Sequence, residues 1–103
     1  MASGTLGQSA PAASTNTTVY TVPALKTATF NVSIANTTGY FVPFRLSISA
    51  TGTPATSEYI EYNTCINAFD TYERGGLIAS AGKNIVVFSE YAGLSVSIYG
   101  YEE

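Results

Sequence analysis

The sequence predicts an all-β fold, an antiparallel β-sandwich of the jelly-roll kind with seven to eight short strands. Three observations predict it. Short runs alternate apolar and polar residues, β-branched and aromatic residues dominate these runs, and segments rich in Gly, Pro and Asn separate them at intervals of roughly ten residues. No segment shows the apolar stripe of a helix over several turns. We expect the 103 residues to form one domain.

The most regular predicted strands have an apolar residue at every second position. Phe30, Val32 and Ile34, for example, are separated by Asn31 and Ser33. This period of two places one face of a strand in a core and the other face toward solvent or a neighbour. It predicts four strands, at residues 20–24, 30–35, 42–49 and 94–99.

Three further predicted strands are less regular. The first covers residues 58–66, and the second covers residues 77–80 directly after Gly75 and Gly76, a pair that predicts a β-bulge. The third is the continuous apolar run 85–88, which is typical of a strand covered on both faces. Over all seven strands, the residues expected in the core are Phe30, Val32, Ile34, Phe44, Leu46, Ile48, Val87, Val96 and Ile98.

The N-terminal segment differs from the rest of the chain. Residues 1–16 are mostly small and carry no charged side chain, so they have little with which to build a core. We therefore predict a flexible arm over residues 1–16, with at most a short strand at residues 5–7, followed by a β-sandwich domain over residues 17–103. The arm would lie along a neighbouring subunit; the alternative is a frayed terminus.

Charge is scarce and excludes two classes of partner. The net charge is −3, and the four basic residues, Lys26, Arg45, Arg74 and Lys83, are scattered along the sequence. No basic stripe is present to neutralise phosphates, which argues against nucleic acid and against anionic lipid. No apolar run approaches the roughly 18 residues that a bilayer span needs. Polar but nearly uncharged surfaces are cheap to desolvate, and this favours packing against protein neighbours.

The residues that usually carry chemistry are also scarce. The chain has no histidine, and its single cysteine, Cys65, has no internal disulfide partner and no histidine to activate it. Asp70 and Glu73 lie beside Arg74 in a segment predicted to be a turn, where solvated charge and a weak calcium site are the two interpretations. We therefore expect a protein that is not an enzyme, with no catalytic residue, no cofactor and no metal.

Tyrosine is unusually frequent, with eight residues in the chain. Tyr59, Tyr99 and Tyr101 fall on strand faces opposite the predicted core, which makes them candidate subunit contacts. Together with the apolar run 85–88 they would form a patch that association hides. The alternative is a sheet face that the domain itself partly covers.

Four segments, residues 5–11, 19–24, 72–82 and 96–102, resemble small virion structural proteins of tailed phages, especially those of cyanobacterial and other aquatic phages. The resemblance extends over nearly the whole chain. It implies a β-sandwich on the particle without enzymatic activity, and it supplies no catalytic residues. It does not distinguish the head from the tail of the particle.

On this basis the expected function is that of a capsid decoration or cement protein located on the virion. Two alternatives stay open: a tail, baseplate or fibre-associated module, and a β-sandwich that binds host polysaccharide. The expected partners are other copies of the chain, as a closed symmetric homotrimer, and the major capsid protein or tail proteins. The trimer is an inference from the resemblance, because such proteins often occupy threefold axes.

Overall fold

The computed structural model describes residues 3–103, which form eight strands and one short 3-10 helix. The elements are β1 (Ser3–Ser9), β2 (Thr17–Thr21), β3 (Ala28–Asn36), β4 (Val42–Ser49), η1 (Thr56–Glu58), β5 (Tyr59–Ile66), β6 (Thr71–Ala79), β7 (Asn84–Ser89) and β8 (Leu94–Glu102). None of the described residues forms a helix that is long and apolar enough to cross a membrane.

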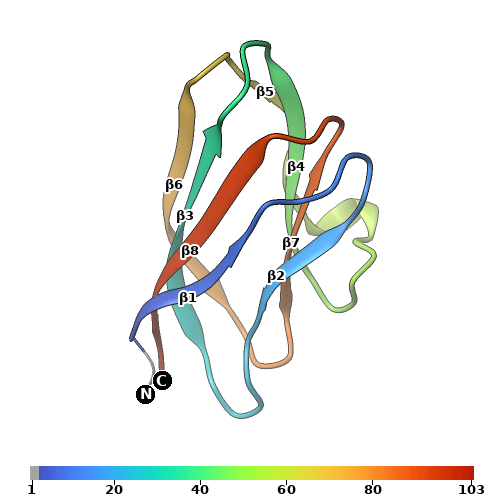
Figure 1. Cartoon of the computed structure of the whole chain (residues 1–103). Helices are drawn as coiled ribbons and strands as arrows, with labels where there is room; N and C mark the ends of the chain where they lie inside the picture. The colour runs from blue at the N-terminus through green and yellow to red at the C-terminus, as the bar shows by residue number, and fades with distance from the viewer. Residues whose placement is uncertain (1–2) are drawn as a thin grey trace.

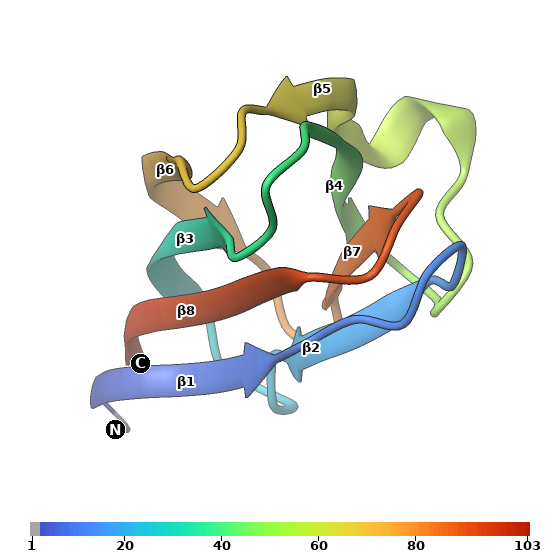
Figure 2. The same cartoon turned by 45° about the horizontal axis from the view of Figure 1, so that its top comes forward.

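The strands form two four-stranded antiparallel sheets that pack face to face (Figures 1 and 2). The first sheet has the order β1-β8-β3-β6 and the second the order β2-β7-β4-β5. The first strand therefore pairs with the last, the second with the seventh, the third with the sixth and the fourth with the fifth. This nesting of pairs is the jelly-roll arrangement, so the predicted fold class is confirmed.

The core lies between the two sheets and is built as the alternation predicts. Of the nine residues expected there, eight are at most 1% exposed, while Ile48 is partly buried and packs against the cluster from the end of β4. Side chains at every second position of β3 point inward, which explains its strictly alternating burial. The run 85–88 is also confirmed as doubly covered over most of its length, because Ile85, Val86 and Val87 are all buried.

The flexible arm predicted for residues 1–16 is wrong for the part that the structure describes; residues 1 and 2 lie outside it. Ser3–Ser9 pair with β8 as the edge strand of the first sheet. Leu6 packs against the core, and Pro11 is buried. Backbone pairing needs no apolar side chains, so a segment of small residues can join a sheet that other strands have built. Residues 3–16 are thus part of the sandwich.

The predicted turn that includes Asp70, Glu73 and Arg74 is wrong for Glu73 and Arg74, while Asp70 closes a turn by donating its N–H to Asn67 O at 3.1 Å. The strand β6 begins at Thr71, so Glu73 and Arg74 lie in a strand. The predicted strand at residues 77–80 is therefore the second half of a longer one. The bulge is confirmed, because the pairing of β3 with β6 shifts register across Gly75 and Gly76. The bulge interrupts the alternation that would have revealed the first half.

Loops collect at the two ends of the sandwich, as the jelly-roll path requires (Figure 1). We call the upper end in Figure 1 the aromatic end; its loops are residues 10–16, 37–41, 67–70 and 90–93. The opposite end has three loops, residues 22–27, 50–58 and 80–83.

Candidate functional site

The three tyrosines predicted to meet a partner do not form one patch. Tyr99 and Tyr101 lie on the outer face of the first sheet, partly exposed, opposite Asn31 and Thr29 of β3. Tyr59 begins β5, the edge strand of the second sheet. The interpretation of the three as a single contact surface is therefore wrong, because their strands belong to different layers. Tyr99 and Tyr101 remain a candidate pair.

The run 85–88 contributes almost nothing to the exposed surface. The prediction that this run forms part of a contact patch together with the tyrosines is therefore wrong. Only Phe88 is partly exposed, and the guanidinium carbon of Arg45 lies 4.6 Å from its ring centroid. The same carbon lies 4.2 Å from the ring centroid of Tyr62, and Arg45 Nε donates a hydrogen bond of 2.8 Å to Asn63 Oδ1. Tyr59 makes an edge contact with Tyr62, with the centroids 4.9 Å apart. The side chains on this part of the second sheet therefore contact one another.

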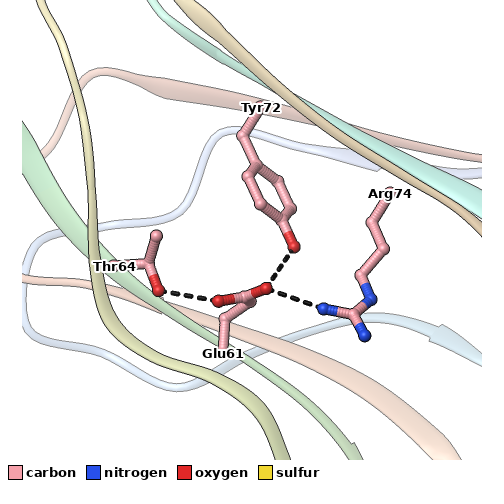
Figure 3. A network of polar contacts seen from close by, with 4 residues as sticks. All are labelled: Glu61, Thr64, Tyr72 and Arg74. Carbon is pink, nitrogen blue, oxygen red and sulfur yellow. Dashed lines mark hydrogen bonds and ion pairs between the residues drawn. The ribbon is translucent and has the colours of Figure 1, made fainter.

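A polar network closes the open side of the sandwich between β5 and β6 (Figure 3). Tyr72 donates a hydrogen bond of 2.7 Å to Glu61 Oε2, and Arg74 Nη1 donates another of 2.8 Å to the same oxygen. Thr64 donates to the other carboxylate oxygen at 2.8 Å. Since β5 and β6 belong to different sheets, Glu61 joins the two layers where no strand pairing does so. The Tyr72 ring also packs 4.8 Å from that of Phe44.

The hydrogen bonds and burial in this network shift the pKa values of Glu61 and Tyr72. The Tyr72 and Thr64 hydroxyls, followed by Arg74, hold the pKa of Glu61 below its ordinary value. Burial and the neighbouring carboxylate raise the pKa of Tyr72. A charged Glu61 and a neutral Tyr72 are thus stable together at neutral pH. Every group has a partner inside the protein, which is typical of a structural contact between layers.

The aromatic end carries the largest group of exposed aromatic side chains. Tyr40 is 54% exposed, Phe41 58%, Phe69 76% and Tyr91 46%. They come from three different loops at one end of the molecule. Tyr40 and Tyr91 meet edge to face, with ring centroids 6.0 Å apart and an interplanar angle of 86°. The alternation of apolar and polar residues does not reveal this group, because its members stand in turn segments, where the period of two does not apply.

One buried side chain holds these loops together. Asn36, at the end of β3, is 3% exposed. Its amide nitrogen lies 2.8 Å from the carbonyl oxygen of Tyr40, 3.0 Å from that of Ile66 and 3.1 Å from that of Asn67. Its oxygen accepts hydrogen bonds from the backbone N–H and the hydroxyl of Thr38, at 2.9 and 2.6 Å. Asn36 therefore connects the loop before β4 to the loop before β6.

Backbone hydrogen bonds complete these connections. Phe69 N donates to Thr38 O at 3.1 Å, and Thr37 N donates to Gly93 O at 2.9 Å. Gly93 has a φ of +116°, and a Cβ there would collide with the Thr38 side chain, so glycine is required at this close approach. Three loops are thus joined to one another, and the aromatic rings stand on a pre-organised backbone.

The aromatic end has acidic residues and no basic ones. Its loops include Asp70 and Glu90 and contain neither Lys nor Arg. Asp70 Oδ1 accepts a hydrogen bond of 2.8 Å from the Thr71 backbone N–H, which leaves its second oxygen for other contacts. The surface is thus aromatic and negatively charged.

Residues 3–103 enclose no detected pocket, and no three of their Cys, Asp and Glu side chains are grouped to hold a metal ion. Comparison with known proteins found no matching family, no matching curated protein and no matching solved structure.

Proposed function

We propose that the protein is a non-enzymatic structural component of a phage particle, acting as a capsid decoration protein in a homo-oligomer. The proposal combines the resemblance of the sequence to small virion proteins with the jelly-roll fold, which many assembly-forming proteins use. Fold alone does not define a function, so the surface residues must support the proposal.

The observation that carries the proposal is the outer face of the first sheet. Gln8, Ser97 and Ser33 occupy one row of outward positions, and Thr29, Tyr101 and Ile78 occupy another. Ile78 is 66% exposed, and Glu73, which lies in the first row opposite Ser33, is the only charged residue among the outward positions of β3, β6 and β8 from the first row to the second. Hydroxyls and amides cost less to desolvate than charges. A sheet face with this composition favours contact with another protein surface.

The self-association within this proposal depends on Tyr99 and Tyr101. Each ring offers apolar area and a polar tip, the combination that is enriched at interfaces. Sedimentation equilibrium should give a trimer for the wild type. The double variant Tyr99→Ala/Tyr101→Ala should dissociate at least about tenfold more readily. Tyr59→Ala is the matched control, because Tyr59 lies on the other sheet. Equal association of the double variant and the wild type would place the interface elsewhere.

The location on a particle is tested directly on the phage that encodes the chain. Mass spectrometry of purified particles should find this chain in many copies for each particle, and immunogold labelling should mark the head. Labelling confined to the tail would favour the alternative of a tail, baseplate or fibre module. Absence of the chain from particles would overturn the proposal.

A further inference from the structure

We propose that the aromatic end is a docking surface for a protein subunit that presents an apolar pocket with lysine or arginine at its rim. This inference deepens the proposed function, on which it rests: the first sheet would join copies of this chain, and the aromatic end would attach them to the particle.

The exposure of Phe69 is the first reason. Its ring is 76% exposed, and its backbone has a φ of +58°, a left-handed conformation that a bulky residue rarely adopts. The residue therefore gains little from burial while it pays a conformational cost. Such strain persists only where the surroundings hold it, and here Phe69 N donates to Thr38 O while Asp70 N closes the turn onto Asn67 O. Leu25 has a similar φ and is also exposed, so the strain alone does not mark a site. Phe69 differs from Leu25 because exposed aromatic residues of two other loops stand at the same end of the molecule.

Pre-organisation is the second reason. Ordering a loop on binding costs free energy, and a surface that is already ordered avoids this cost. Asn36 and the bonds around Thr37 and Thr38 order the loops before any partner arrives. Rigid aromatic anchors on ordered loops are typical of high-affinity protein contacts.

Ring geometry and charge select the kind of partner. Tyr40 and Tyr91 are perpendicular, so they do not form a joint platform on which sugar rings would lie flat. Phe41 and Phe69 lack the polar tip that suits a wet sugar surface, and an apolar protein pocket accommodates them better. Asp70 and Glu90 are the charges of this end, and a cationic rim would complement them.

The experiment uses particles assembled from a phage genome that lacks this gene, mixed with purified full-length protein. Occupancy is measured by co-sedimentation at increasing protein concentration. Phe69→Ala should raise the concentration for half occupancy about tenfold or more. Leu25→Ala is the matched control, since Leu25 is 96% exposed, has a φ of +64° and lies at the opposite end. It should bind within twofold of the wild type.

A second variant tests the role of charge. The double substitution Asp70→Asn with Glu90→Gln should weaken binding several-fold and reduce the dependence of binding on salt. Asparagine retains an oxygen for the Thr71 N–H, so this pair should leave the loop intact. Circular dichroism melts of all variants verify that each is folded.

The outcomes separate the two proposals. Occupancy by the wild type with equal occupancy by Phe69→Ala would overturn the docking surface and leave the proposed function standing. Absence of wild-type occupancy would overturn both. Retention on host cell-wall polysaccharide that Phe69→Ala abolishes would assign this end to sugar instead of protein. Loss of self-association in Phe69→Ala, with unchanged particle occupancy, would assign it to a second copy.

Discussion

The two ends of the sandwich are held by chemically different side chains. At the aromatic end, Asn36 is a buried neutral amide that joins two loops. At the opposite end, the carboxylate of Glu58 accepts hydrogen bonds from Ala55 N at 2.8 Å, Ala50 N at 2.9 Å and the Ser49 hydroxyl at 3.0 Å. The hydrogen bonds of Asn36 at the aromatic end therefore do not depend on pH, while those of Glu58 at the opposite end depend on an ionised group.

This difference shows how a small jelly roll can have one end whose loops are held independently of pH and another end whose loop is sensitive to pH. The buried amide cannot titrate, and it supports the exposed rings of the aromatic end. The carboxylate folds residues 50–58 back on themselves at the end of β4. Each end can therefore be perturbed selectively, and the core beneath both can be perturbed as a reference.

The largest expected effect is on the core that both ends share. Phe44 is fully buried and packs against Tyr72, so Phe44→Ala should lower the free energy of unfolding by about 3 to 5 kcal/mol. Urea denaturation monitored by circular dichroism measures it. Because the loss is global, amide exchange should rise at both ends together. A midpoint close to that of the wild type would show that the face assignment of β4 is wrong.

The next effect should be confined to the aromatic end. Asn36→Ala removes the side-chain donor to the carbonyl groups of Ile66 and Asn67, which should cost about 1 to 3 kcal/mol. The Thr38 hydroxyl can still donate to Tyr40 O, but the Thr38 N–H loses its acceptor. Hydrogen exchange should rise most at the amides of Thr38 and Phe69. The amide of Val22, at the opposite end, serves as the internal control. An equal rise at Val22 would show that Asn36 supports the whole fold instead of one end.

A smaller effect follows acidification and should be confined to the opposite end. The pKa of Glu58 lies below its ordinary value of 4.5, chiefly because the amides of Ala55 and then Ala50 donate to the carboxylate. A lowered pKa means that the stabilisation is complete above pH 4.5 and is lost as the pH falls through the pKa of the folded protein. The amide proton shifts of Ala50 and Ala55 should titrate in that window. Glu58→Gln should abolish the titration, and shifts that persist in this variant would contradict the assignment.

The smallest expected effect concerns backbone strain at a residue for which no binding partner is proposed. Leu25 is nearly fully exposed in a left-handed conformation, so Leu25→Gly should change the free energy of unfolding by about 1 kcal/mol or less, toward greater stability. Thermal melts measure the shift. The aromatic end offers the parallel change, Phe69→Gly, which should behave alike in stability while it alone impairs docking. A clear loss of stability in Leu25→Gly would indicate contacts that its exposure hides.

Sequence patterns predicted the parts of this fold that depend on side-chain alternation. The strictly alternating β3 and the inward residues of β8 needed only the period of two, and the Gly75-Gly76 bulge followed from glycine alone. The same reasoning failed for β1, whose small residues show no period and which joins the sheet through backbone pairing. It failed again for the first half of β6, which the bulge separates from its apolar half.

The candidate sites combine residues that are far apart in the sequence, and no local sequence pattern shows that such residues lie close together. The sequence by itself determined an all-β chain with low charge and a core of alternating residues, because burial and backbone geometry act on neighbouring positions. Only the tertiary structure decided that Tyr59 lies on a different sheet from Tyr99, and that Phe69 stands at the same end as Tyr40 and Tyr91. The physical reason is the nesting of strand pairs, which brings loops from distant parts of the chain to one end and lets one buried amide, Asn36, join two of them.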